Sequence, residues 1–150
     1  MKAFRYAAVL AASFSLAFAA PALADDPWPT EEGDYVQVSM ISIKDGHDLH
    51  YIQFLAGQWR KNQDFAKAQG WISGYEILVN ENRRPGEPDL YLVVRFPEVA
   101  NKAEAKKREA AFDAFNQQTT AQMEAASGER ASYRTQMGSQ LLRALVWKSK

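Results

Sequence analysis

The chain has 150 residues, with 18 lysines and arginines against 18 aspartates and glutamates, and it contains no cysteine. A length of this order suits one domain. Balanced charge gives no basic surface of the kind that binds nucleic acid, so no nucleic-acid partner is expected. The lack of cysteine excludes disulfides, thiol catalysis and cysteine-ligated metal sites. Stability therefore has to come from the core, from a partner subunit, or from both.

The first 24 residues have the features of a bacterial secretory signal peptide. Two basic residues open the chain, residues 7–19 are apolar, and Ala22 and Ala24 form an A-x-A cleavage site. The apolar run is short for a membrane span, which needs roughly 20 residues. An uncleaved N-terminal anchor is the alternative. Cleavage leaves a chain that starts at Asp25, carries 16 basic against 18 acidic residues and has no membrane segment, so we expect a periplasmic or secreted protein.

The segments that follow predict an irregular leader, a strand and a helix. Residues 25–33 hold two prolines and four acidic residues, which favour irregular structure. Apolar and polar residues alternate over residues 35–44, as in a half-buried strand. Asp45 is placed to cap a helix over residues 47–69, where apolar side chains recur at helical spacing. Gly70 is a typical helix stop.

The second half of the chain predicts a hairpin, a long helix and a final strand. The order β-α-β-β-α-β over residues 34–150 predicts an α+β domain of the ferredoxin-like type, with one antiparallel sheet and both helices on one face. The predicted elements are strands over residues 71–79, 90–96 and 141–148, a helix over residues 99–127, and a polar loop over residues 130–140.

The runs KAQGWISGYEILVN and LYLVVRF, separated by a bend and followed by a helix, resemble the dimeric α+β barrel superfamily. This superfamily includes antibiotic-biosynthesis monooxygenases and stress-responsive barrel domains, and the resemblance covers residues 35–147. It implies a homodimer in which two helix-free sheet faces close into a barrel. A wide apolar sheet face also needs such a cover in water.

Two charged residues, Glu76 and Arg95, lie in the middle of predicted strands. A hairpin centred near Pro85 and Gly86 places them opposite each other, where opposite charges interact directly. With the fourth, first, third and second strands side by side, polar residues of one parity form a row on the helix-free face. The row consists of Arg143, Gln37, Ser39, Arg95, Tyr91 and Glu76.

Two interpretations of this row are open. One is an ion pair in or near the dimer interface that fixes register and partner geometry. The other is a pocket in the barrel lumen, where apolar walls with a few polar groups bind a small molecule and the arginines favour a carboxylate or another anion.

The remaining candidate constellations are weak. His47 and His50 are three residues apart and could both reach a metal ion, but a polar first helical turn with solvated histidines is the favoured explanation, and no metal site is predicted. Trp59, Trp71 and Tyr75, together with Asn62, are residue types that cofactor-free monooxygenases of the superfamily use, although their spacing does not match that motif. Aromatic residues on a helix stripe or strand are usually core. No cofactor is predicted.

The sequence therefore predicts an exported, dimeric barrel protein that binds a small anionic or aromatic ligand in a lumen on the helix-free sheet face. Two alternatives remain. The first is a cofactor-independent enzyme of the monooxygenase or isomerase type, and the second is a structural or stress-related accessory domain without a ligand.

Overall fold

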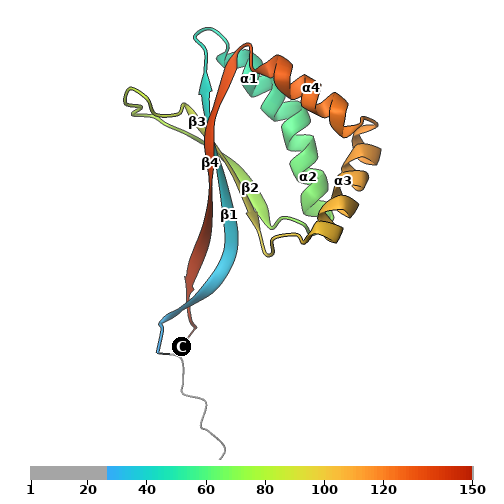
Figure 1. The fold of residues 1–150 in the computed structure, drawn as a ribbon. Coiled ribbons are helices and arrows are strands. Elements are labelled where there is room, and N and C mark those ends of the chain that lie inside the picture. Colours follow the sequence, from blue (N-terminus) through green and yellow to red (C-terminus); the bar gives the residue numbers. More distant parts are fainter. Residues whose placement is uncertain (1–26, 150) are drawn as a thin grey trace, which may run out of the picture.

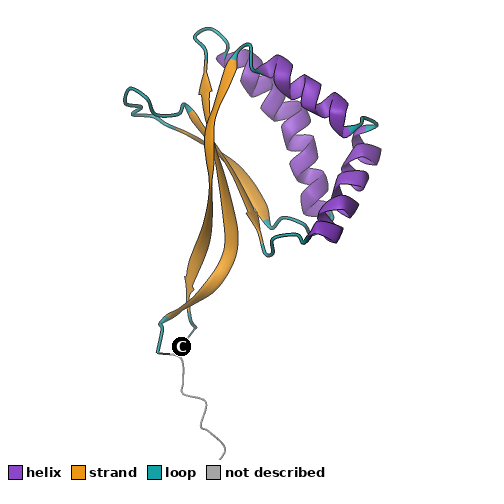
Figure 2. Ribbon diagram, viewed as in Figure 1, coloured by secondary structure: helices purple, strands orange, loops and turns teal. Residues whose placement is uncertain are grey.

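The computed structural model describes residues 27–149, so the expected signal peptide over residues 1–24 lies outside the described residues. The chain forms one antiparallel sheet in the order β2-β3-β1-β4, with its helices on one face (Figure 1; Figure 2). The predicted ferredoxin-like α+β class and the predicted strand order are both confirmed. The elements are β1 (Thr30–Ile43), α1 (Asp48–Phe54), the π-helical turn η1 (Leu55–Trp59), α2 (Arg60–Ala68), β2 (Gly74–Val79), β3 (Leu90–Phe96), α3 (Lys102–Asn116), α4 (Thr120–Arg130) and β4 (Arg134–Trp147).

β1 and β4 each have 14 residues and are at least twice as long as β2 and β3. They continue beyond these two strands as a two-stranded ribbon (Figure 1). Their pairing begins with Thr30 opposite Trp147. The leader expected over residues 25–33 is therefore wrong in its second half, which belongs to β1. Cross-strand pairing with the apolar end of β4 overrides the weak strand preference of the acidic residues there.

The polar loop expected over residues 130–140 is also wrong, because most of it belongs to β4. β4 is an edge strand of the sheet, so its polar side chains remain in contact with water. A register shift beside Met40 interrupts its pairing with β1, and Gly138 lies there with φ 137°, a conformation that favours glycine.

The first helix runs without a break through α1, η1 and α2. It begins after His47 and has no side-chain cap, so the predicted capping by Asp45 is wrong. The turn at Gly46, where φ is 81°, lies between Asp45 and the helix and leaves that carboxylate too early in the chain to cap it. Gly70 follows α2 with φ 71°, as expected for a glycine that ends a helix.

The single long helix expected over residues 99–127 is wrong, because two helices, α3 and α4, occupy this segment. Gln117 ends α3 in the left-handed conformation, with φ 53°. Thr119 then caps α4, and its side chain and that of Gln122 form a reciprocal capping box. No helix within residues 27–149 is long and apolar enough to cross a membrane.

The main core holds the helices to the sheet at one end only. Tyr51 and Leu55 are each 1% exposed and provide the helical side of this core. They pack where β1 ends and β3 begins, against four buried side chains of the sheet and its margin: Ile41, Leu90, Leu92 and Tyr133. Farther along, α2 and α3 pack on each other through aromatic rings, and Phe65 stacks on Phe115 with centroids 4.1 Å apart.

We expect Leu55→Ala to lower the free energy of unfolding by about 2–5 kcal/mol, because it removes a buried side chain and leaves a cavity. Leu49→Ala is the matched control, since Leu49 lies on the same helix and is 71% exposed. It should change the free energy by no more than about 0.5 kcal/mol. Urea unfolding at one protein concentration measures the free energy of unfolding of both variants. Equal losses of this free energy would show that Leu55 is not part of the stabilising core.

Candidate functional site

The expected row of six polar residues is divided between the two faces of the sheet. Residues directly opposite each other across a strand pair share a face. Gln37 lies opposite Val94 and Ser39 opposite Leu92, which belongs to the core beneath the helices. Both polar side chains are therefore on the helix-covered face, and the parity predicted for β1 is wrong.

Glu76, Tyr91 and Arg95 are on the helix-free face, as predicted. Val38 lies opposite Val93, which in turn lies opposite Glu76, so β1 places its valines on this face. Alternation alone could not assign the faces of β1, because both of its parities carry apolar residues.

Arg95 donates a hydrogen bond from Nη2 to Glu76 Oε1 at 2.6 Å, so the predicted ion pair exists. Its geometry differs from the prediction, because Arg95 lies opposite Gly74 and the pair is diagonal. The hairpin is centred between Arg84 and Pro85, one residue earlier than expected. Each side chain is 41% exposed and satisfied by the other, which favours the structural interpretation of this pair.

Arg143 lies at the base of the ribbon, on the opposite face of the sheet from Glu76, Tyr91 and Arg95. It is opposite Tyr35, which places it on the helix-covered side, and its guanidinium lies 4.0 Å from the centre of that ring. It also pairs with Glu32 at 3.2 Å, and Tyr35 stacks on Phe96. Arg143 therefore supports the ribbon and does not join Arg95.

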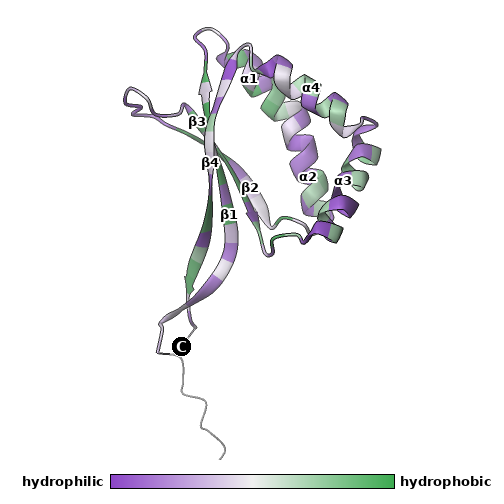
Figure 3. Ribbon diagram, in the orientation of Figure 1, coloured by the Kyte–Doolittle hydropathy of each residue, from purple (hydrophilic) through white to green (hydrophobic). Residues whose placement is uncertain are grey.

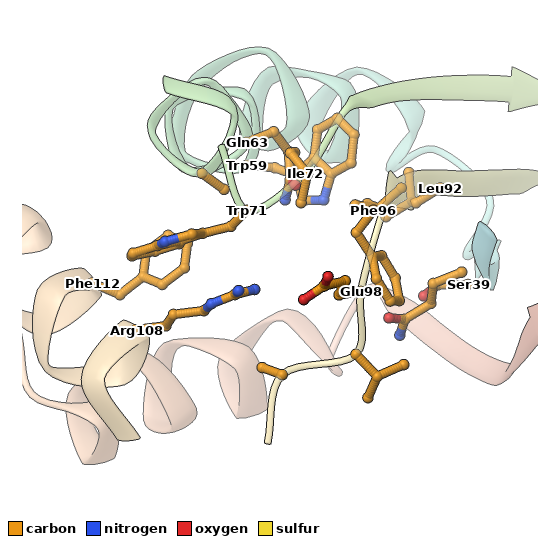
Figure 4. A pocket seen from close by; sticks show the side chains of 15 residues that line it. Ser39, Trp59, Gln63, Trp71, Ile72, Leu92, Phe96, Glu98, Arg108 and Phe112 are labelled. Atoms are coloured by element: carbon orange, nitrogen blue, oxygen red, sulfur yellow. The ribbon is translucent and has the colours of Figure 1, made fainter. Parts of the chain in front are cut away.

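A hollow of about 560 Å³ lies between the helices and the sheet, beyond the end that the core closes. Figure 4 shows aromatic side chains from η1, the α2–β2 loop, β3 and α3 around it. Its volume is within the range typical of small-molecule sites. The apolar wall includes Trp59, Trp71, Leu92, Val94, Phe96 and Phe112, and the polar groups are Gln37, Ser39, Gln63, Glu98 and Arg108.

Aromatic contacts between helices fix one wall of this cavity. Trp71 packs edge-on against Phe65 at 5.5 Å and lies 5.4 Å from Phe112, measured between ring centroids. Phe65 also contacts Phe112 at 5.3 Å. The cluster joins α2, the following loop and α3, so these rings present a preformed apolar surface.

Arg108 is the cation of the cavity, and its neighbours hold it in place. Its Nε donates to Glu104 Oε1 at 2.9 Å, and its guanidinium lies 5.5 Å from the centre of the Trp71 ring. This hydrogen bond lowers the pKa of Glu104. Figure 4 shows the guanidinium directed across the cavity toward Glu98. No salt bridge joins Arg108 to Glu98 in the part of the chain described, so the end of the guanidinium remains available to a ligand.

The sequence pattern missed Arg108 because its segment, KAEAKKREA, alternates basic residues with Glu and Ala, which is typical of a solvated helix face. One feature of the sequence does connect Arg108 with the aromatic cavity. Arg108 lies four residues before Phe112, so the two share a face of α3. The side chain of Arg108 is only 25% exposed, against 80% for its neighbour Lys107.

The residue types compared with cofactor-free monooxygenases do not form one group. Trp59 and Trp71 line the cavity, whereas Asn62 accepts a hydrogen bond from Gln58 and faces a different hollow. Tyr75 packs edge-on against Trp59 and donates a hydrogen bond to Asp64, which raises the pKa of Tyr75.

Residues 27–149 contain no group of three or more His, Asp or Glu side chains arranged to hold a metal ion. His47 and His50 both pack against the ring of Tyr133, with centroids 5.7 and 4.3 Å away.

We expect Arg108→Gln to raise the pKa of Glu104, because the hydrogen bond from Arg108 favours the charged carboxylate. The bond should persist above the lowered pKa of Glu104 and be lost as pH falls through it. Lys107→Gln is the control, since Lys107 is 4.0 Å from Glu104 and should have a smaller effect. Carbon-detected NMR titration of the Glu104 carboxyl measures both. An unchanged pKa in Arg108→Gln would show that Glu104 does not hold the guanidinium.

Comparison of this chain with protein-family models, with curated proteins and with solved structures finds no match. The candidate site therefore rests on its geometry, and the resemblance to the dimeric α+β barrel superfamily stays a prediction.

Proposed function

We propose that this protein binds a small molecule with a flat apolar body and an anionic group in the cavity between its helices and its sheet. The observation that carries the proposal is an aromatic-walled hollow of about 560 Å³ with Arg108 fixed at its side. Apolar walls with a few oriented polar groups are typical of ligand sites, and arginine suits carboxylates and related anions. This location replaces the barrel lumen expected on the helix-free face, where Arg95 and Glu76 neutralise each other.

The polar side chains of the cavity suggest how such a ligand would lie. The apolar body would pack against Trp71 and Phe112, and the anionic group would accept hydrogen bonds from the free end of the Arg108 guanidinium. Ser39 and Gln63 lie on the same lining and offer further hydrogen bonds. Arg108 would lose little conformational entropy when a ligand binds, because Glu104 and Trp71 already restrict its side chain.

We also propose that the protein is exported to the periplasm or secreted, and that a second copy covers its helix-free face. Leu78, Leu142 and Val146, on this face, are 47%, 48% and 44% exposed, and the ribbon end of β4 is largely hydrophobic (Figure 3). Exposed apolar side chains on a sheet face favour association. A closed dimer of two such faces is the arrangement that the superfamily resemblance implies.

Arg108→Gln should weaken the binding of anilinonaphthalene sulfonate, an aromatic anion, by about tenfold or more, because charge-assisted hydrogen bonds are lost. Lys106→Gln removes the same charge from an exposed position of α3 and should leave the affinity unchanged. Fluorescence titration measures both.

A cavity-filling variant, Ser39→Trp, distinguishes this cavity from other apolar surfaces. It should reduce dye binding strongly while the far-ultraviolet circular dichroism stays that of the wild type. Equal affinity for the dye in the wild type, Arg108→Gln and Ser39→Trp would overturn the proposal.

Leu142→Glu should convert a dimer to a monomer, because it places a charge in the proposed interface on the helix-free face. Leu141→Glu is a matched control: Leu141 is the preceding residue of β4, is 57% exposed and faces the other side. Size-exclusion chromatography with light scattering measures the mass of each. A wild-type protein that is monomeric at micromolar concentration would reject the dimer and leave the cavity proposal to the dye titration.

A further inference from the structure

A second hollow, of about 610 Å³, lies at the opposite end of the helix layer from the aromatic cavity. It is formed between α1 and the turn that leads from α4 into β4. Its hydrogen-bonding side chains include His50 and Gln53 from α1, Arg130 at the end of α4, and Ser132 in the turn. These donors come from segments distant in sequence and meet around one opening.

Arg130 has an incomplete set of partners. Its guanidinium lies 4.1 Å from the centre of the Phe54 ring, and its Nε is buried without a hydrogen-bond acceptor. Burial, followed by the nearby Arg134, lowers the pKa of Arg130. Within residues 27–149 no carboxylate forms a salt bridge with Arg130 or with Arg134, although Glu129 lies on the same opening as Arg130. A half-buried cation that forms no salt bridge is unfavourable, so the binding of an anion beside it would be favourable.

Further cations lie near the turn that follows Arg130, although neither Arg134 nor Lys44 lines the hollow itself. Arg134 donates a hydrogen bond to Ser127 and, like Arg130, has a buried Nε without an acceptor. Lys44 donates to the carbonyl oxygen of Ser132 at 2.7 Å, which brings a third cation to the turn. The imidazole of His50 stacks on Tyr133 with centroids 4.3 Å apart, so its orientation is supported.

A structural role explains only part of this arrangement. Arg130 is in the last turn of α4, where a cation interacts favourably with the helix dipole, and it packs on Phe54. Neither contact supplies an acceptor for the buried Nε of Arg130 or of Arg134.

We propose that this corner is a binding site for an oxyanion, the phosphate or carboxylate group of a ligand, held between Arg130 and His50. Gln53 and Ser132 supply neutral hydrogen bonds at the same opening. The site is separate from the aromatic cavity, and it does not depend on the function proposed for that cavity.

The test is a titration of the isotope-labelled protein with inorganic phosphate and, separately, with acetate, followed through the arginine Nε–H signals by NMR. The Arg130 signal should shift and saturate, and added sodium chloride should weaken the binding because the interaction is between charges. Stronger binding of phosphate would identify a phosphorylated ligand, and stronger binding of acetate a carboxylic acid.

Arg130→Gln should weaken the preferred anion by about tenfold or more. His50→Gln should also weaken it, and His50 is exposed, so this variant keeps the test valid if Arg130→Gln fails to fold. The His50→Gln titration is followed through the Arg130 signal, and the Arg130→Gln titration through the backbone amide signals of Gln53 and Ser132, which line the same opening. Arg60→Gln is the control, because Arg60 is an exposed arginine of α2 outside this opening. An Arg130 signal that does not saturate in the wild type, or equal affinities in wild type and His50→Gln, would overturn the proposal.

Discussion

The packing of Tyr51 and Leu55 against the ends of β1 and β3 is the contact on which the rest of the structure depends. It holds the helix layer to the sheet at one end, and the aromatic cluster around Phe65 holds α2 to α3 at the other. The space between the two clusters is the cavity. A sheet packed against its helices along its whole length would have filled that space with side chains. The proposed ligand site is thus a consequence of where the core stops.

The same limited core leaves apolar surface on the opposite face of the sheet. A chain that has no disulfides and buries few of its described side chains completely is expected to have a small free energy of unfolding. If two copies pair through this face, as proposed, the Arg95–Glu76 ion pair would favour one relative orientation of the subunits, because displacing either residue would leave a charge unpaired. One face would then provide association, and the other would provide binding.

Much of the fold could be predicted from the sequence, because alternation along the strands and helical spacing after Gly46 are strong local signals. The strand order followed from the βαββαβ sequence of elements. The break between α3 and α4 was missed, although Thr119 and Gln122 have the spacing of a capping box, because the surrounding residues are good helix formers.

The site was harder to predict for physical reasons. The bend between β2 and β3 is rich in turn residues, so its centre could be misplaced by one residue, and that shift turned a direct pair into a diagonal one. Gln37 and Ser39 were identified as candidates but assigned to the wrong face, since β1 is apolar on both sides. Arg108 and Glu98 join the cavity only because α3 folds back toward the sheet, which no local pattern records.

A small molecule held in the aromatic cavity should remain bound when the protein is purified from its own source without added ligands. Native mass spectrometry of that protein detects it. We expect a dimer of chains beginning at Asp25 that carries extra mass, which denaturation releases and whose value identifies the ligand. A dimer without bound mass that also fails to take up aromatic anions would contradict the proposal that the cavity holds a small molecule.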